Sequence, residues 1–373
     1  MRYVVTILSV FALLATATAQ SQNWQIVPPA DTMFRYLGRI DSSDPEEYAF
    51  YYPGIEIRAA FTGTSCFLLL GNESFGGQDA NGNLHSSYYN VFIDDSLAVI
   101  EVPEGKQVIK VAENLKDTVH LLRLYKRTEA ICGRATFRGL GLDPGAGLVP
   151  WPAAPPALRI EFIGNSITCG YGNEGDDASC GFTAATENSY LSYGSIAARR
   201  LNAEYVAVAY SGKGVIQNYD RSAQETLPEI YQRINPSDTV SQWDFALWKP
   251  DIVVLNLGTN DFAHELPDSA TFVAAYASFL KRIAAYYPEV RMVCLMGPMI
   301  NDSWPPGLKA ATVCRSYIKA AMKLAATPYT VFFEMSAQGP YGFGCDYHPN
   351  IRQHQKNAEE LSAFISDWMA SER

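Results

Sequence analysis

The chain has 373 residues, a formal net charge of −10 and no basic cluster. Two domains are expected, because a single hydrophobic core rarely organises more than about 250–300 residues. The acidic balance excludes nucleic acid and an anionic membrane surface as partners and favours a neutral ligand.

Residues 1–19 have the layout of a secretory signal peptide. Arg2 is followed by an apolar run from Tyr3 to Leu14 and by small residues as far as Ala19. We therefore predict cleavage after Ala19 and a secreted or periplasmic monomer. A membrane anchor is not expected, since no later apolar run approaches the roughly 18 residues that span a bilayer.

The seven cysteines are an odd number, so at least one is unpaired even in an oxidising compartment. Cys169 and Cys180 bracket one loop and are the bridge that we expect. The spacings contain no CxxC pairing and give no signal for a metal site. We therefore expect neither a metal nor another cofactor.

Residues 20–148 are predicted to form an all-β domain. From Ile55 to about Phe137 the chain runs in short alternating segments such as "GIEIRAAF" and "YYNVFIDD", bounded by turn residues. This pattern is typical of a β-sandwich, with a jelly roll as the favoured form. The prolines of "GLVPWPAAPPA" then impose stiff, extended backbone, so residues 149–156 are the expected linker.

Residues 157–373 alternate between strand-like and helix-like segments. The strand-like segments are "LRIEFIG", "EYVAVAYSG", "DIVVLNLG", "VRMVCLMG" and "YTVFFEM". Helical periodicity follows them at 188–203, 223–234, 269–287, 308–326 and 351–370. The alternation predicts a three-layer α/β domain with a five-stranded, mostly parallel sheet. Ligands of such sheets bind beyond the carboxyl ends of the strands.

Four polar positions fall at that edge of the predicted sheet. Ser166 follows the first strand, Gly212 lies in a glycine-rich turn after the second, Asn260 follows the third, and His348 precedes the last helix. Taken singly, Ser166 fits a helix N-cap, Gly212 a turn, Asn260 a helix start and His348 an ordinary loop histidine. Together they supply the nucleophile, the base and the oxyanion donors that acyl transfer requires.

The same residues carry a family resemblance. "GNSIT", "SGKG", "GTND" and "DYHP", in this order, resemble the four blocks of the SGNH (GDSL-type) hydrolase superfamily. With a β-sandwich in front and "LYKRTE" ahead of the linker, the chain resembles carbohydrate esterase family 2, whose members are two-domain exported enzymes that deacetylate plant polysaccharides. The resemblance implies Ser166 as nucleophile and His348 as base. It also implies an oxyanion hole formed by Gly212, Asn260 and the backbone amide of Ser166.

One position departs from the superfamily pattern. The usual spacing is D-x-x-H, but here Cys345 stands three residues before His348 and Asp346 only two. Either Asp346 orients the base as the third member of a triad, or a main-chain carbonyl holds the Nδ1 proton in a Ser–His dyad. His264 and His354 are weaker candidates for the base.

Aromatic residues near these blocks predict a carbohydrate substrate. Trp304, in the loop after the fourth strand, and the flanking Tyr171 and Tyr347 are candidates for stacking on a sugar ring, although Trp304 equally suits a ring that covers the local core. We therefore predict an esterase that removes O-acetyl groups from polysaccharides such as xylan and glucomannan.

Two other functions remain open at this stage. A general SGNH lipase or thioesterase would need an apolar acyl tunnel, which the sequence neither shows nor excludes. A carbohydrate-binding protein with a decayed hydrolase domain is disfavoured, because Ser166, Asn260 and His348 are all present.

Overall fold

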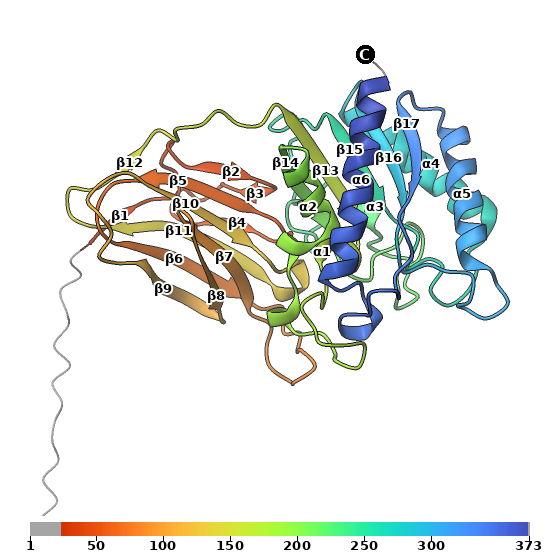
Figure 1. The fold of residues 1–373 in the computed structure, drawn as a ribbon, viewed down its shortest axis with the longest axis horizontal. Coiled ribbons are helices and arrows are strands. Elements are labelled where there is room, and N and C mark those ends of the chain that lie inside the picture. Colours follow the sequence, from red (N-terminus) through yellow and green to blue (C-terminus); the bar gives the residue numbers. More distant parts are fainter. Residues whose placement is uncertain (1–23, 372–373) are drawn as a thin grey trace, which may run out of the picture.

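A computed structural model describes residues 24–371, which form an all-β domain and an α/β domain packed side by side (Figure 1). The signal peptide predicted for residues 1–19 lies outside the described residues. Within residues 24–371, no helix combines the length and apolar character needed to cross a bilayer.

The N-terminal domain is a sandwich of two six-stranded antiparallel sheets, as the alternating segments predicted. One sheet has the order β3-β4-β11-β6-β9, with β1 paired to β11; the other has the order β12-β5-β10-β7-β8, with β2 paired to β5. Side chains such as Phe61, Leu68, Leu122 and Phe137 fill the space between them. The strands are β1 (Gln25–Val27), β2 (Arg35–Leu37), β3 (Ile40–Asp41), β4 (Tyr48–Phe50), β5 (Glu56–Phe61), β6 (Cys66–Glu73), β7 (Ser87–Ile93), β8 (Ser96–Val102), β9 (Gly105–Ala112), β10 (His120–Lys126), β11 (Arg134–Leu142) and β12 (Leu148–Val149).

The shortest strands of the sandwich had not been expected. β1 to β4 have two or three residues each, too few to show a period of two. β12 includes Val149, the first residue of the predicted linker, and pairs with β5. The chain is therefore still paired in a sheet of the sandwich where the predicted linker begins.

The C-terminal domain contains the predicted five-stranded sheet, and all of its strands are parallel. Their order is β14-β13-β15-β16-β17. The strands are β13 (Leu158–Gly164), β14 (Ala203–Ala209), β15 (Ile252–Asn256), β16 (Arg291–Met296) and β17 (Thr330–Glu334). Every residue of the central β15 is buried, because helices cover both faces of the sheet.

Helices α2 (Tyr193–Arg200) and α6 (Ile351–Ser371) cover one face of this sheet. Helices α3 (Leu227–Ile230), α4 (Ser269–Tyr286) and α5 (Ala310–Ala325) cover the other (Figure 1).

Two of the predicted helices are shorter than the sequence indicated. The helix expected over 188–203 begins only at Tyr193, after a 3₁₀ turn at Ser189–Leu191. The helix expected over 223–234 has a single turn, α3. The main-chain oxygens that follow α3, those of Tyr231 and Arg233, accept hydrogen bonds from the guanidinium of Arg39 in the other domain.

A buried ion pair joins the two domains. Arg39 lies 3.2 Å from Glu161 on β13, and both side chains are inaccessible to solvent. The Tyr231 hydroxyl donates to the other carboxylate oxygen of Glu161 at 2.6 Å. Because removing one partner of a buried pair typically costs about 3–5 kcal/mol, this contact fixes the sandwich against the sheet.

Candidate active site

Ser166 is the first residue of the short helix α1 (Ser166–Cys169), directly after β13. The N-cap of this helix is Asn165, whose side-chain oxygen accepts a hydrogen bond from Ile167 N at 3.3 Å. Ser166 therefore does not cap the helix, which was the alternative open from sequence. Its hydroxyl is available for another partner.

That partner is His348. Nε2 of His348 lies 2.8 Å from Oγ of Ser166, although 182 residues separate the two along the chain. Nδ1 of the same ring faces two main-chain oxygens, those of Cys345 at 3.2 Å and Asp346 at 3.1 Å. With the proton on Nδ1 bonded to these carbonyls, Nε2 is left free to accept the proton of the serine.

The carboxylate of Asp346 has a different partner. It accepts a hydrogen bond from the Tyr171 hydroxyl at 2.7 Å. Asp346 and Tyr347 adopt left-handed backbone conformations, with φ of 50° and 60°. This turn directs the main-chain oxygen of Asp346 toward His348 and its side chain toward Tyr171, so the geometry is that of a Ser–His pair oriented by the main chain.

Tyr171 lies against the base. Its ring stacks on that of His348, with 4.1 Å between the centroids and 28° between the planes. Its other neighbour is Phe182, at 4.6 Å. Tyr171, predicted to bind substrate, thus has its ring against His348 and its hydroxyl bonded to Asp346.

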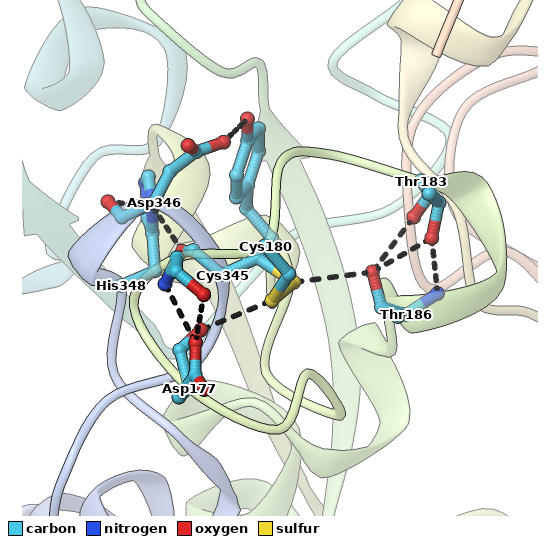
Figure 2. The surroundings of a disulfide bond; sticks show 9 residues. Asp177, Cys180, Thr183, Thr186, Cys345, Asp346 and His348 are labelled. Carbon is cyan, nitrogen blue, oxygen red and sulfur yellow. Dashed lines mark hydrogen bonds between the residues drawn. A yellow bond between two sulfur atoms is a disulfide. The ribbon is translucent and has the colours of Figure 1, made fainter. Parts of the chain in front are cut away.

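A disulfide anchors the turn that carries the base. Cys345 is bonded to Cys180, beside Asp346 and His348 (Figure 2). The predicted Cys169–Cys180 bridge is therefore wrong, and Cys169 is a free, buried thiol on α1. The backbone amide of Asp346 also donates to the main-chain oxygen of Cys180 at 2.9 Å, so two links hold this turn in place.

The glycine-rich turn after β14 is shaped by its neighbours. Gly212 has a φ of 77°, a conformation that favours glycine. Asn260 donates from its side-chain nitrogen to Lys213 O at 2.8 Å, which leaves its second N–H available. Ser166 and Asn260 are each only 8% exposed. An oxyanion held among these donors would therefore be largely shielded from water.

Asp261 is a residue whose role the sequence reasoning missed. Its carboxylate accepts hydrogen bonds from the backbone amides of Val215, Ile216 and Gln217 at 2.8–3.1 Å. Burial nevertheless raises the pKa of Asp261 to about 6. The carboxylate ties the turn that contains Gly212 to the loop that contains Asn260.

The remaining candidate residues lie in different settings. Trp304 and Tyr347 are each 64% exposed, so neither ring covers a local core. Nδ1 of the buried His354 accepts a hydrogen bond from Tyr193 N. Nε2 of His264 bonds to the main-chain oxygen of Tyr219. Neither histidine shares the contact of His348 with Ser166.

Two known family models match the chain. Residues 36–152 match the family model described as "Carbohydrate esterase 2 N-terminal", and residues 162–356 match the "GDSL-like Lipase/Acylhydrolase family". The chain belongs to carbohydrate esterase family 2. It is an esterase with the two-domain architecture of that family.

Two relatives of the esterase carry functional names. The cellulase/esterase CelE of Acetivibrio thermocellus is 35% identical over 337 residues, 89% of this chain, which spans only 39% of that relative. An acetylxylan esterase / glucomannan deacetylase of Cellvibrio japonicus is 28% identical over 92% of this chain and 91% of its own length.

Solved structures show the same fold. A family two carbohydrate esterase from Clostridium thermocellum, in complex with cellohexaose, superposes with a TM-score of 0.81 at 32% identity. The match covers 90% of this chain and 99% of that one. A family two esterase from Cellvibrio japonicus also has a TM-score of 0.81, at 25% identity, with 93% and 98% of the two chains covered.

Proposed function

We propose that this esterase is exported and removes O-acetyl groups from plant cell-wall polysaccharides such as xylan and glucomannan. The observation that carries the proposal is the 2.8 Å contact between Ser166 Oγ and His348 Nε2 at the carboxyl edge of the parallel sheet. A relative named acetylxylan esterase / glucomannan deacetylase and a relative solved with cellohexaose support the choice of substrate.

In this mechanism His348 takes the Ser166 proton as Oγ attacks the acetyl carbonyl carbon. The backbone amides of Ser166 and Gly212 and the side-chain amide of Asn260 donate to the resulting oxyanion. Collapse breaks the bond to the sugar oxygen, which leaves with the proton from His348. Water, deprotonated by His348, then hydrolyses the acetyl-serine, releases acetate and restores both residues.

A comparison of substrates tests the proposal. Acetate release from acetylated xylan and glucomannan is measured beside hydrolysis of a long-chain aryl ester. We expect efficient deacetylation of the polysaccharides and little turnover of the long acyl chain. Preference for the long chain would favour the lipase alternative, and binding of glycan without release of acetate would favour the decayed enzyme.

Replacing Tyr347 by alanine is expected to lower kcat/KM for acetylated oligosaccharides about tenfold and to leave turnover of a small aryl acetate within about twofold. Only the oligosaccharide offers a ring to stack on this exposed side chain, which adjoins the base. Trp304→Ala, measured in parallel, shows whether the second exposed ring belongs to the same subsite. Equal losses on both substrates would indicate that Tyr347 instead supports the turn at His348.

The pH profile is expected to reflect the enclosed position of the base. Burial lowers the pKa of His348 to about 4, so the imidazole stays neutral and able to accept a proton until the pH falls near that value. The acid decline of kcat/KM should therefore have its midpoint near pH 4, with activity retained at higher pH. Measurement of kcat/KM for an aryl acetate from pH 3 to pH 9 checks this.

Imidazole NMR of the wild type and of His348→Ala assigns the His348 resonance. It therefore distinguishes the titration of the base from that of other groups. A partial decline near pH 6 would reflect protonation of Asp261, the pKa of which burial raises to about 6. A His348 resonance that titrates near pH 6.5 would contradict the prediction.

A further inference from the structure

A buried polar cluster lies between the two domains, behind the glycine-rich turn. Glu129 ends the "LYKRTE" segment of the sandwich domain, and Glu187 belongs to a loop of the hydrolase domain. None of the side chains in the cluster is exposed to solvent; its members are Lys126, Glu129, Cys132, Cys169 and Glu187. Charged groups in such a place must be paired or neutralised.

Lys126 is the basic member of this cluster; burial lowers its pKa, and the neighbouring carboxyl groups favour its ammonium form. Its Nζ donates to the main-chain oxygens of Tyr51 at 3.1 Å, Thr128 at 2.5 Å and Glu129 at 3.1 Å. These three acceptors use all three N–H groups of an ammonium. Two ionised glutamates beside one lysine would leave an excess negative charge in the interior.

A single proton on Glu187 removes that excess. The backbone amide of Glu129 donates to Oε2 of Glu187 at 2.9 Å, whereas the buried Oε1 has no hydrogen-bond partner at an N–H or hydroxyl group. Oxygens of the two carboxyl groups lie within 4.8 Å of each other. Burial raises the pKa of both groups, and the charge of Glu129 raises that of Glu187 further. One proton shared between the two carboxyl groups leaves a single anion to balance Lys126.

A metal ion is not needed to balance this cluster. Cys169 is the third group that could ligate an ion beside the two glutamates. Burial and the neighbouring carboxyl groups raise the pKa of the Cys169 thiol well above its ordinary value. A protonated sulfur adds no further negative charge to the cluster.

The ionised Glu129 holds the backbone just before Gly212. One of its oxygens accepts from Ser211 N at 2.7 Å, and the other accepts from the Ser211 hydroxyl. The thiol of Cys169, on the helix that begins with Ser166, lies within 4.8 Å of the Glu129 carboxylate. One side chain of the sandwich domain thus bonds to the turn before Gly212 and lies beside the helix that begins with Ser166.

We propose that Glu129 is a positioning residue, the ionised member of a carboxyl pair sharing one proton with Glu187, and that it fixes the backbone N–H of Gly212 in the oxyanion hole. This inference rests on the proposed function of Gly212. It gives the β-sandwich domain a part in the chemistry of the neighbouring site, in addition to any contact with substrate.

Substitution of Glu129 by glutamine tests the proposal. The variant keeps the shape of the side chain but turns an NH₂ group toward one of the two donors of Ser211. We expect kcat for 4-nitrophenyl acetate to fall at least about 30-fold and KM to change less than about threefold. Glu56→Gln is the matched control, because Glu56 is a buried carboxylate paired with Arg58 and Arg123, away from the site.

A second readout separates positioning from general damage to the fold. Phenylboronic acid forms a tetrahedral adduct with an active-site serine, and its affinity should fall in proportion to kcat, while KM for the aryl acetate should stay within about threefold. Ser211→Ala, which removes only the hydroxyl bond to Glu129, should lower kcat about fivefold. This variant decides the question if Glu129→Gln does not fold.

Glu187→Gln identifies which carboxyl group holds the proton. Its amide can donate to Glu129 as the protonated acid does, so we expect a loss in kcat of no more than about threefold. Wild-type kcat in both Glu129→Gln and Ser211→Ala, or a severe loss in Glu187→Gln alone, would overturn the proposal. Failure of the wild-type enzyme to deacetylate xylan or glucomannan while it hydrolyses the aryl acetate would contradict the proposed substrate and leave this test intact.

Discussion

Replacement of Ser166 by alanine is expected to lower kcat for an aryl acetate by roughly 10⁴-fold or more. No other hydroxyl among the described residues is hydrogen-bonded to His348 Nε2, so the variant has no replacement for the nucleophile. The free energy of unfolding should change by less than about 1 kcal/mol, because the cap of α1 is provided by Asn165. Steady-state kinetics and a denaturant titration of the same preparation measure the two effects.

Asn165→Ala is the matched variant for this experiment. It removes the side-chain cap of α1 but leaves the serine hydroxyl in place, so its stability should fall by about 0.5–2 kcal/mol. If Ser166→Ala instead lost stability and kept its activity per folded molecule, the serine would have a structural role and the proposed mechanism would fail.

The fold could be predicted where a segment shows a continuous apolar run or a clear helical periodicity. The buried β15 reads as a continuous apolar run, and α4 shows a clear helical period over many residues. Two-residue strands such as β3 carry no such pattern. The length of α3 could not be predicted either; the chain after it bonds through the carbonyls of Tyr231 and Arg233 to Arg39, nearly two hundred residues earlier in the chain.

The candidate site could be predicted in part for a related reason. Strand ends of a parallel sheet meet at one edge, so the positions of Ser166 and His348 followed from the order of elements. The partner of Cys180 did not follow, since Cys345 is 165 residues away and nothing local indicates the pairing. The hydrogen bond between Glu129 and Ser211 joins two domains and residues 82 positions apart, so it could not be predicted. The sequence drew attention only to the "LYKRTE" segment, which ends in Glu129.

Replacement of His348 by alanine should reduce kcat by roughly 10³-fold or more, whereas Asp346→Asn should cost about tenfold or less. The loss of the imidazole removes both the proton acceptor for Ser166 and the acid that protonates the leaving sugar oxygen. Asparagine at 346 keeps an oxygen for the Tyr171 hydroxyl and keeps the main-chain carbonyl that faces Nδ1. What is lost is a nearby negative charge, which favours the imidazolium that forms as the serine attacks.

The ratio of these two losses distinguishes the dyad from a triad. A carboxylate that bonds directly to the base sets its tautomer, so its conversion to an amide costs several orders of magnitude in kcat. Here the main-chain oxygens of Cys345 and Asp346 set the tautomer, and no side-chain substitution at either position removes them. Comparable, severe losses in His348→Ala and Asp346→Asn would show that the carboxylate turns toward Nδ1 during the reaction. A small loss in Asp346→Asn, with the acid limb of the pH profile shifted slightly downward because the anion no longer favours the protonated imidazole, is the result that the main-chain arrangement requires.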